Sequence, residues 1–113
     1  MLRFILCDDD EVQLDEIAGF TRQWADANNI NVEISQFTSG KAVLEQFQPQ
    51  RNDIVICDII MPDMDGLTLA QSLRSLRPDF HIIFISSSTD FALQAYDAHP
   101  YGYLVKPCSY EDF

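Results

Sequence analysis

Five short apolar runs, separated by stretches with helical spacing, constrain the fold of this chain more than any other feature. The runs are Phe4–Cys7, Val32–Ile34, Ile54–Cys57, Ile82–Ile85 and Tyr103–Val105. The first, third and fourth show little alternation of apolar and polar residues, which is typical of strands buried on both faces of a parallel sheet. The second run alternates, so we predict that it forms an edge strand.

The segments between the runs carry apolar or small residues at helical spacing. The four stripes are Leu14, Ile17, Ala18, Thr21 and Ala25; Gly40, Val43, Leu44 and Phe47; Leu69, Ala70 and Leu73; and Phe91, Ala92, Ala95 and Tyr96. Ser39 and Asp65 are the predicted N-caps of the second and third helices.

This alternation of strands and helices predicts an α/β fold. For 113 residues we expect a flavodoxin-like, doubly wound, five-stranded parallel sheet with strand order 2-1-3-4-5. Residues 1–113 are predicted to form a single domain. Because the chain ends at Phe113, where a fifth helix would be starting, that helix is expected to be truncated or missing, and the chain to be a fragment of a longer protein.

Polar residues stand at four of the predicted strand ends. Asp8 and Asp9 follow the first strand, Asp58 follows the third, Ser86 ends the fourth and Lys106 follows the fifth. In open α/β sheets, ligands bind outside the carboxyl ends of the strands. The predicted strand order makes the first and third strands neighbours, so the three carboxylates are expected to share one rim with the hydroxyl and the ammonium group.

Three gathered carboxylates repel one another unless a divalent cation lies among them. Oxygen ligands with open positions suit Mg²⁺, which needs only one or two carboxylates plus a phosphate. Asp58 could then act as a nucleophile on phosphorus, with Ser86 and Lys106 holding phosphoryl oxygens. A single acid after a strand more often caps a helix, and Asp8, Asp9 or Asp10 could cap the first one. The agreement of four strand ends favours a site for phosphoryl transfer.

Charge and cysteine usage exclude several classes of function. The net charge of −11 argues against direct binding of nucleic acid, which needs Lys and Arg to neutralise phosphates. No apolar run approaches the roughly 20 residues that span a membrane, and we expect a cytoplasmic protein without membrane contact. Cys7, Cys57 and Cys108 match no disulfide or zinc pattern. Cys7 and Cys57 lie in apolar runs and are predicted to be buried thiols.

Over nearly its full length the chain resembles the receiver domains of two-component response regulators. The matching pieces are Phe4–Asp9, Asp58–Gly66, Ile83–Ser86 and Tyr103–Pro107. The resemblance implies that Asp58 is the phosphorylation site. It also implies that Asp9, Asp58 and the backbone carbonyl of Ile60 bind Mg²⁺ directly, with Asp8 acting through water.

The resemblance assigns further roles and partners. Ser86 and Lys106 would contact the phosphoryl oxygens, and Tyr103 would be an aromatic switch that responds to phosphorylation. A sensor histidine kinase would be the donor, and phosphorylation would favour a homodimer. The chain would be a phosphoacceptor with slow self-dephosphorylation at most, and not a turnover enzyme.

A finer resemblance is to the LytTR-type (LytR/AlgR) branch of response regulators. It rests on Cys7–Asp9, Phe91–Tyr96 and Tyr103–Pro107. That branch usually carries a C-terminal DNA-binding domain. Contact with DNA would therefore lie in a separate output domain that this chain controls.

Two other functions remain open. A haloacid-dehalogenase-like phosphatase also uses an aspartyl phosphate with Mg²⁺, but it places a second acid two residues after the nucleophile, where this chain has Ile60. A degenerate receiver would bind partners without being phosphorylated. The complete set of site residues argues against this second alternative.

Overall fold

The computed structural model describes residues 2–47, 53–59, 61, 64–76, 81–86 and 102–105, with the backbone alone for residues 53 and 102–105. In chain order the elements are β1 (Leu2–Cys7), α1 (Glu11–Ala27), β2 (Val32–Phe37), α2 (Gly40–Gln46), β3 (Asp53–Asp58), α3 (Gly66–Leu76), β4 (His81–Ser86) and β5 (Gly102–Val105). Each predicted apolar run lies within one of these strands. The helix predicted around residues 91–96 and the expected truncation of a fifth helix lie outside the described residues.

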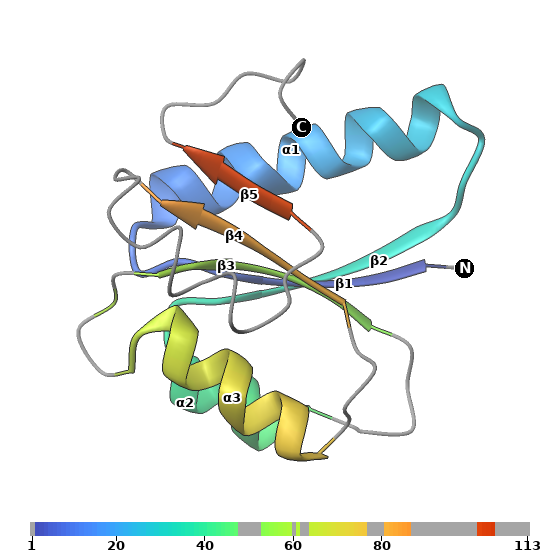
Figure 1. Ribbon diagram of the computed structural model, residues 1–113. Helices are drawn as coiled ribbons and strands as arrows, with labels where there is room; N and C mark the ends of the chain where they lie inside the picture. The colour runs from blue at the N-terminus through green and yellow to red at the C-terminus, as the bar shows by residue number, and fades with distance from the viewer. Residues whose placement is uncertain are drawn as a thin grey trace.

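The five strands form one parallel sheet in the order β2-β1-β3-β4-β5 (Figure 1). This is the predicted order, and β2 is an edge strand as its alternating pattern indicated. The order brings β1 and β3 side by side in the middle of the sheet although 45 residues lie between the end of β1 at Cys7 and the start of β3 at Asp53. The carboxyl ends of these two strands therefore meet at one edge.

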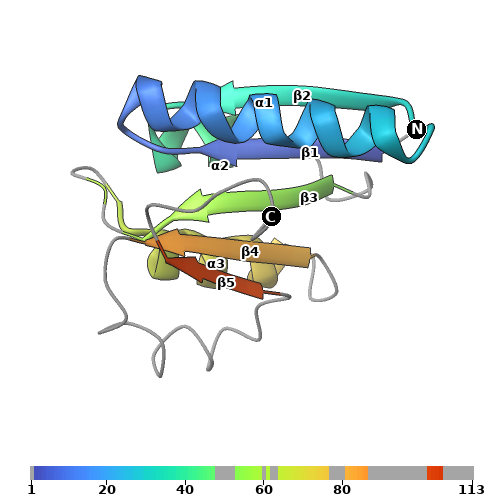
Figure 2. The same ribbon diagram turned by 90° about the horizontal axis from the view of Figure 1, so that it is seen from above.

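Helices cover both faces of the sheet. Helix α1 lies on one face and helices α2 and α3 on the other (Figure 1), and the view from above shows α1 running along β1 and β2 (Figure 2). Side chains alternate between the faces along each strand. Accordingly, Leu6 and Ile56 pack with α1, while Cys7 and Cys57 pack on the α2 and α3 side.

The first and third predicted stripes are buried faces of α1 and α3. Of the second stripe, Gly40 and Val43 are buried in α2 and Phe47 is buried just after its end, and the fourth stripe lies outside the described residues. All five positions of the first stripe are buried in α1, including Thr21, whose hydroxyl donates a hydrogen bond to the carbonyl oxygen of Ile17 at 2.8 Å. That bond satisfies the one polar group in the stripe. Among the described residues, no helix combines the length and the apolar character that a membrane crossing requires.

The predicted N-caps are confirmed, and the structure decides which acid caps the first helix. Ser39 accepts a hydrogen bond from the backbone N–H of Ala42 at 3.4 Å, and Asp65 accepts one from Thr68 at 2.7 Å. At α1 the cap is Asp10, whose side chain accepts from the N–H groups of the second and third helical residues at 3.0 and 3.5 Å. Capping therefore does not account for Asp8 or Asp9.

The Asp10 cap can be tested without disturbing the site beside it. We expect Asp10→Ala to lower the free energy of unfolding by about 1 kcal/mol, because two N–H groups lose their acceptor. Asp10→Asn keeps an acceptor and is expected to lie within a few tenths of a kcal/mol of the wild type. Urea unfolding of the three proteins measures the difference. Equal stability of Asp10→Ala and the wild type would show that the cap contributes nothing.

Candidate functional site

The end of β1 and the end of β3 bring the predicted acids together. Cys7 and Cys57 are register partners, so the next residue of each strand extends to the same edge. Asp58 is the last residue of β3, so the strand ends one position later than predicted and includes the acid that was expected to follow it. Asp8 follows β1, and its backbone N–H donates to the carbonyl oxygen of Phe37 at 3.1 Å. The end of the neighbouring strand β2 thus fixes the backbone of Asp8.

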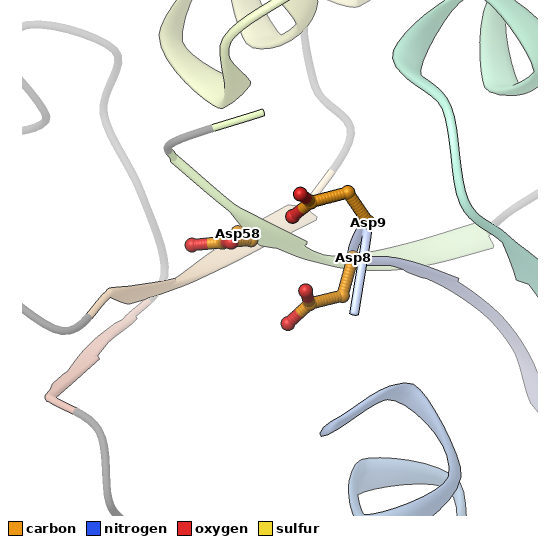
Figure 3. Close-up of side chains that lie close together, drawn as sticks. All are labelled: Asp8, Asp9 and Asp58. Atoms are coloured by element: carbon orange, nitrogen blue, oxygen red, sulfur yellow. The ribbon is translucent and has the colours of Figure 1, made fainter. Parts of the chain in front are cut away.

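Three carboxylates form the centre of the site. One carboxylate oxygen from each of Asp8, Asp9 and Asp58 lies within 4.8 Å of the others. Figure 3 shows the side chains at adjacent strand ends with their carboxylates directed toward the same side. Asp8 and Asp58 are buried, whereas Asp9 is exposed. The cluster is thus partly buried and open to solvent through Asp9.

A local turn orients Asp8 within this cluster. Its Oδ1 accepts a hydrogen bond from the backbone N–H of Asp10 at 2.9 Å. Aspartate side chains commonly bond to the backbone two residues ahead, so the Asp8-Asp9-Asp10 sequence contained a signal for this turn that the sequence analysis did not use. The turn holds Asp8 in the cluster and also begins α1.

Ser86 reaches the same edge of the sheet. It is the last residue of β4 and is buried. In the β3–β4 ladder Asp58 is the partner of Ile85, so Ser86 lies one position beyond the residue that faces Asp58. On its other side Ser86 is the register partner of Val105, the last residue of β5.

For three predicted site residues the structure describes no side chain. Ile60 and Lys106 lie outside the described residues, and for Tyr103 the structure describes the backbone in β5 but not the side chain. The three acids and the one hydroxyl residue that are described all lie at the carboxyl edge of three neighbouring strands: Asp8, Asp9, Asp58 and Ser86. The predicted roles of the other three residues stay predictions.

A close approach of Gly66 to the end of β3 was not foreseen. The backbone N–H of Gly66 donates to the carbonyl oxygen of Ile59 at 2.7 Å. A Cβ atom at position 66 would overlap the backbone oxygen of Asp58 and lie 3.0 Å from the Cα atom of Ile59. The start of α3 thus rests directly against the backbone that carries Asp58. Gly66 ends the stretch Asp58–Gly66 that matched the receiver family, but nothing in the sequence predicted its contact with the backbone at the end of β3.

The donor set fits a hard divalent cation. All three side chains offer oxygen, and their spacing allows one ion to contact more than one of them. Mg²⁺ binds such oxygen sites through one or two carboxylates and retains open positions for waters and phosphate oxygens. The positive ion would also offset the mutual repulsion of three carboxylates, which is strong where the surroundings are partly desolvated. The arrangement suits an acidic Mg²⁺ pocket with a nucleophilic carboxylate.

Comparisons with known proteins agree with this geometry. The family described as response regulator receiver domain matches residues 4–113. The transcriptional regulatory protein RprY of Bacteroides fragilis is 30% identical over 113 residues, covering 98% of this chain and 45% of that protein. The positive alginate biosynthesis regulatory protein of Pseudomonas aeruginosa is 37% identical over 75 residues, covering 66% of this chain and 30% of that protein. The chain therefore spans less than half the length of these relatives.

Solved structures show the same fold. The response regulator TrrA of Thermotoga maritima, in complex with Mg(2+)-BeF, superposes with a TM-score of 0.84 at 23% identity and covers 99% of this chain and 92% of that chain. The match to the family extends over almost the whole sequence and includes every strand end that carries an acid or Ser86. This chain belongs to the response regulator receiver domain family of two-component systems.

Proposed function

We propose that this receiver domain is a phosphoacceptor switch in which Asp58 takes a phosphoryl group from a sensor histidine kinase in the presence of Mg²⁺. The observation that carries the proposal is the gathering of Asp8, Asp9 and Asp58 within 4.8 Å at the ends of two neighbouring strands. Receiver domains as a class are signalling phosphoacceptors. The TrrA complex with Mg(2+)-BeF supports the same use of the pocket here.

In the proposed reaction Asp58 is the nucleophile. One of its carboxylate oxygens attacks the phosphorus of a phosphohistidine, the P–N bond breaks, and the imidazole leaves on the opposite side. Mg²⁺, when bound, neutralises charge on the phosphoryl oxygens. Asp9, Asp58 and the carbonyl oxygen of Ile60 would hold the ion directly, and Asp8 would hold it through water. The buried position of Asp58 restricts the attack to donors that reach the open side at Asp9.

Two further residues are proposed to stabilise the transferred group. The Ser86 hydroxyl, at the end of β4, and the Lys106 ammonium group would each contact a phosphoryl oxygen as charge spreads over the three equatorial oxygens. Phosphorylation adds about −1.5 to −2 charge, which would draw Ser86 toward the acceptor. The space that Ser86 vacates would admit the ring of Tyr103, and the altered surface would favour a homodimer.

Intact mass tests the central step. We expect incubation with acetyl phosphate and Mg²⁺ to add the mass of one phosphoryl group to the wild type and to Asp15→Ala, in which an exposed acid of α1 is removed. Asp58→Ala is expected to gain none, and removal of Mg²⁺ with EDTA should prevent the gain in the wild type. If the folded wild type gains no mass, the domain is a degenerate receiver that acts as a protein-interaction module. An adduct that persists in Asp58→Ala would place the acceptor elsewhere.

The wider setting is also part of the proposal. We infer that the domain works in the cytoplasm and controls a separate output domain, with transcription regulation through DNA binding of the LytTR type. The residues Cys7–Asp9, Phe91–Tyr96 and Tyr103–Pro107 support this branch, and the similarity to two regulatory proteins supports a role in transcription. Slow loss of the phosphoryl group, without steady-state hydrolysis of small phosphomonoesters, would distinguish the switch from a haloacid-dehalogenase-like phosphatase.

A further inference from the structure

Two buried thiols stand directly before the acids of the candidate site. Cys7 is the last residue of β1 and precedes Asp8, and Cys57 precedes Asp58 at the end of β3. Both side chains belong to the core cluster on the α2 and α3 face of the sheet, and they are 2% and 0% exposed. A buried free cysteine behaves as a small hydrophobic residue that also carries a weak S–H donor. The acceptors of these two donors therefore bear on the site.

Both thiols donate a hydrogen bond to the chain at or just after the end of β3. The Sγ atom of Cys57 donates to the backbone carbonyl oxygen of Asp58 at 3.1 Å, and the Sγ atom of Cys7 donates to the Sδ atom of Met61 at 3.5 Å. An ordinary thiol is protonated at neutral pH, and the neighbouring Cys7 side chain together with burial raises the pKa of the Cys57 thiol further. Cys57 therefore remains a donor.

Two consecutive backbone carbonyl groups are held by donors of the protein. The carbonyl oxygen of Asp58 accepts from the Cys57 thiol, and that of Ile59 accepts from the backbone N–H of Gly66 at 2.7 Å. The next carbonyl group along the chain, that of Ile60, is the one proposed above to bind Mg²⁺ directly. The Cys57 thiol thus fixes a peptide group two positions before the proposed metal ligand.

The second thiol acts on the other side of Ile60. The carbonyl group of Ile60 belongs to the peptide group that joins it to Met61, and the Met61 side chain, which is 7% exposed, accepts the bond from Cys7. Cys7 is covalently joined to Asp8, so this contact links the strand that leads to Asp8 with the chain that follows Asp58. The chain is therefore anchored by a thiol both before and after Ile60.

We propose that Cys7 and Cys57 are positioning residues for the Mg²⁺ site, whose thiols hold the backbone on both sides of Ile60 in the geometry that the ion requires. This inference rests on the proposed function, because it concerns the ligands of the ion used there. The thiols contact neither the ion nor the phosphoryl group and act through the backbone of Asp58 and the side chain of Met61. Hydrogen-bonded partners behind metal ligands orient those ligands and commonly affect metal affinity.

Two substitutions of Cys57 separate the loss of the donor from the loss of the sulfur atom. Cys57→Ala removes the donor, whereas Cys57→Ser replaces the thiol with a hydroxyl group that can donate to the same carbonyl oxygen. We expect Cys57→Ala to bind Mg²⁺ about tenfold more weakly than the wild type in calorimetric titration. Cys57→Ser is expected to keep the affinity of the wild type. The proposal is wrong if the folded Cys57→Ser protein binds as weakly as Cys57→Ala.

Val55→Ala is the control for lost packing. Val55 lies two residues earlier on β3, is fully buried in the same core cluster, and its side chain has no hydrogen-bonding group. Its truncation is expected to lower Tm, because buried methyl groups are lost, and to leave the Mg²⁺ affinity unchanged. If Val55→Ala loses as much affinity as Cys57→Ala, the effect of Cys57 is one of packing and the proposal is wrong.

Met61→Leu tests the second thiol and keeps the proposal falsifiable if Cys57→Ala fails to fold. It preserves volume in the core and removes the sulfur atom that accepts from Cys7. We expect it to bind Mg²⁺ at least about threefold more weakly than the wild type, a smaller loss than for a closer partner. Wild-type affinity in either folded variant, Cys57→Ala or Met61→Leu, would overturn the proposal and leave the phosphoacceptor function standing. A wild type that binds no Mg²⁺ would overturn the proposed function as well.

Discussion

Gly66→Ala is expected to destabilise the protein by about 3 kcal/mol, the upper part of the range for overpacked sites. The added Cβ atom would overlap the backbone oxygen of Asp58 and press on the Cα atom of Ile59. Both contacts are with backbone, which cannot move aside as a flexible side chain can. The hydrogen bond from Gly66 N–H to the Ile59 carbonyl oxygen, 2.7 Å long, would be stretched as α3 moves away. We expect a fall in Tm of roughly 10 °C or more, measured by thermal unfolding.

Gly19→Ala is the matched control for this substitution. Gly19 lies inside α1, and a Cβ atom there would meet nothing within 4 Å. Alanine is favoured over glycine in a helix interior by about 0.5–1 kcal/mol, so this variant is expected to be more stable than the wild type. The same chemical change thus has opposite signs at two positions. A Gly66→Ala protein as stable as Gly19→Ala would contradict the close approach of α3 to the end of β3.

Asp9→Asn is expected to have two opposite effects, depending on Mg²⁺. Without a divalent cation it should raise Tm, because it removes one of three carboxylates that repel one another within 4.8 Å. With Mg²⁺ it should weaken binding of the ion at least about tenfold, as expected when a charged metal partner is lost. The stabilisation that bound Mg²⁺ gives to the folded state would shrink accordingly. Because Asp9 is exposed, the fold itself should tolerate the change.

Asp15→Asn provides the control for charge alone. Asp15 is an exposed acid of α1 outside the three-carboxylate cluster, so its replacement changes the net charge equally. We expect the Mg²⁺ affinity of Asp15→Asn, measured by calorimetric titration, to equal that of the wild type. If Asp15→Asn and Asp9→Asn lose the same affinity, Mg²⁺ is attracted by the overall negative charge and not held at the strand ends.

Local patterns were sufficient to predict the strands and the layers of the sheet. Apolar runs with little alternation indicated strands buried on both faces, and β1, β3 and β4 are the three central strands of the sheet. The alternating second run indicated an edge strand, and β2 has one neighbour. The helix N-caps Ser39 and Asp65 could also be predicted from the sequence, because a cap depends on residues within three positions of each other.

The candidate site was predictable to the extent that it depends on strand ends. Neighbouring parallel strands end at the same edge of a sheet. Knowing where each strand ends was therefore enough to predict that Asp8, Asp58 and Ser86 lie together. The sequence left three acids as candidates for the cap of the first helix. The structure assigns the cap to Asp10 and turns Asp8 toward the cluster through a hydrogen bond of 2.9 Å. The backbone conformation directs the side chains of these adjacent acids to different places, and this direction decides which acid caps the helix. Composition does not specify it.

The five apolar runs by themselves determined that this chain builds a parallel sheet. The residues that end or follow these runs placed Asp8, Asp9 and Asp58 at its carboxyl edge. Strand formation and side-chain alternation are local properties, so a one-dimensional pattern is enough to specify them. Tertiary structure alone decided which sulfur atoms meet and how closely Gly66 approaches Asp58. Cys7 and Met61 are 54 positions apart, and their contact depends on strand register and on the course of the chain after β3. Such distances are set by the packing of all the elements together, and no local pattern encodes them.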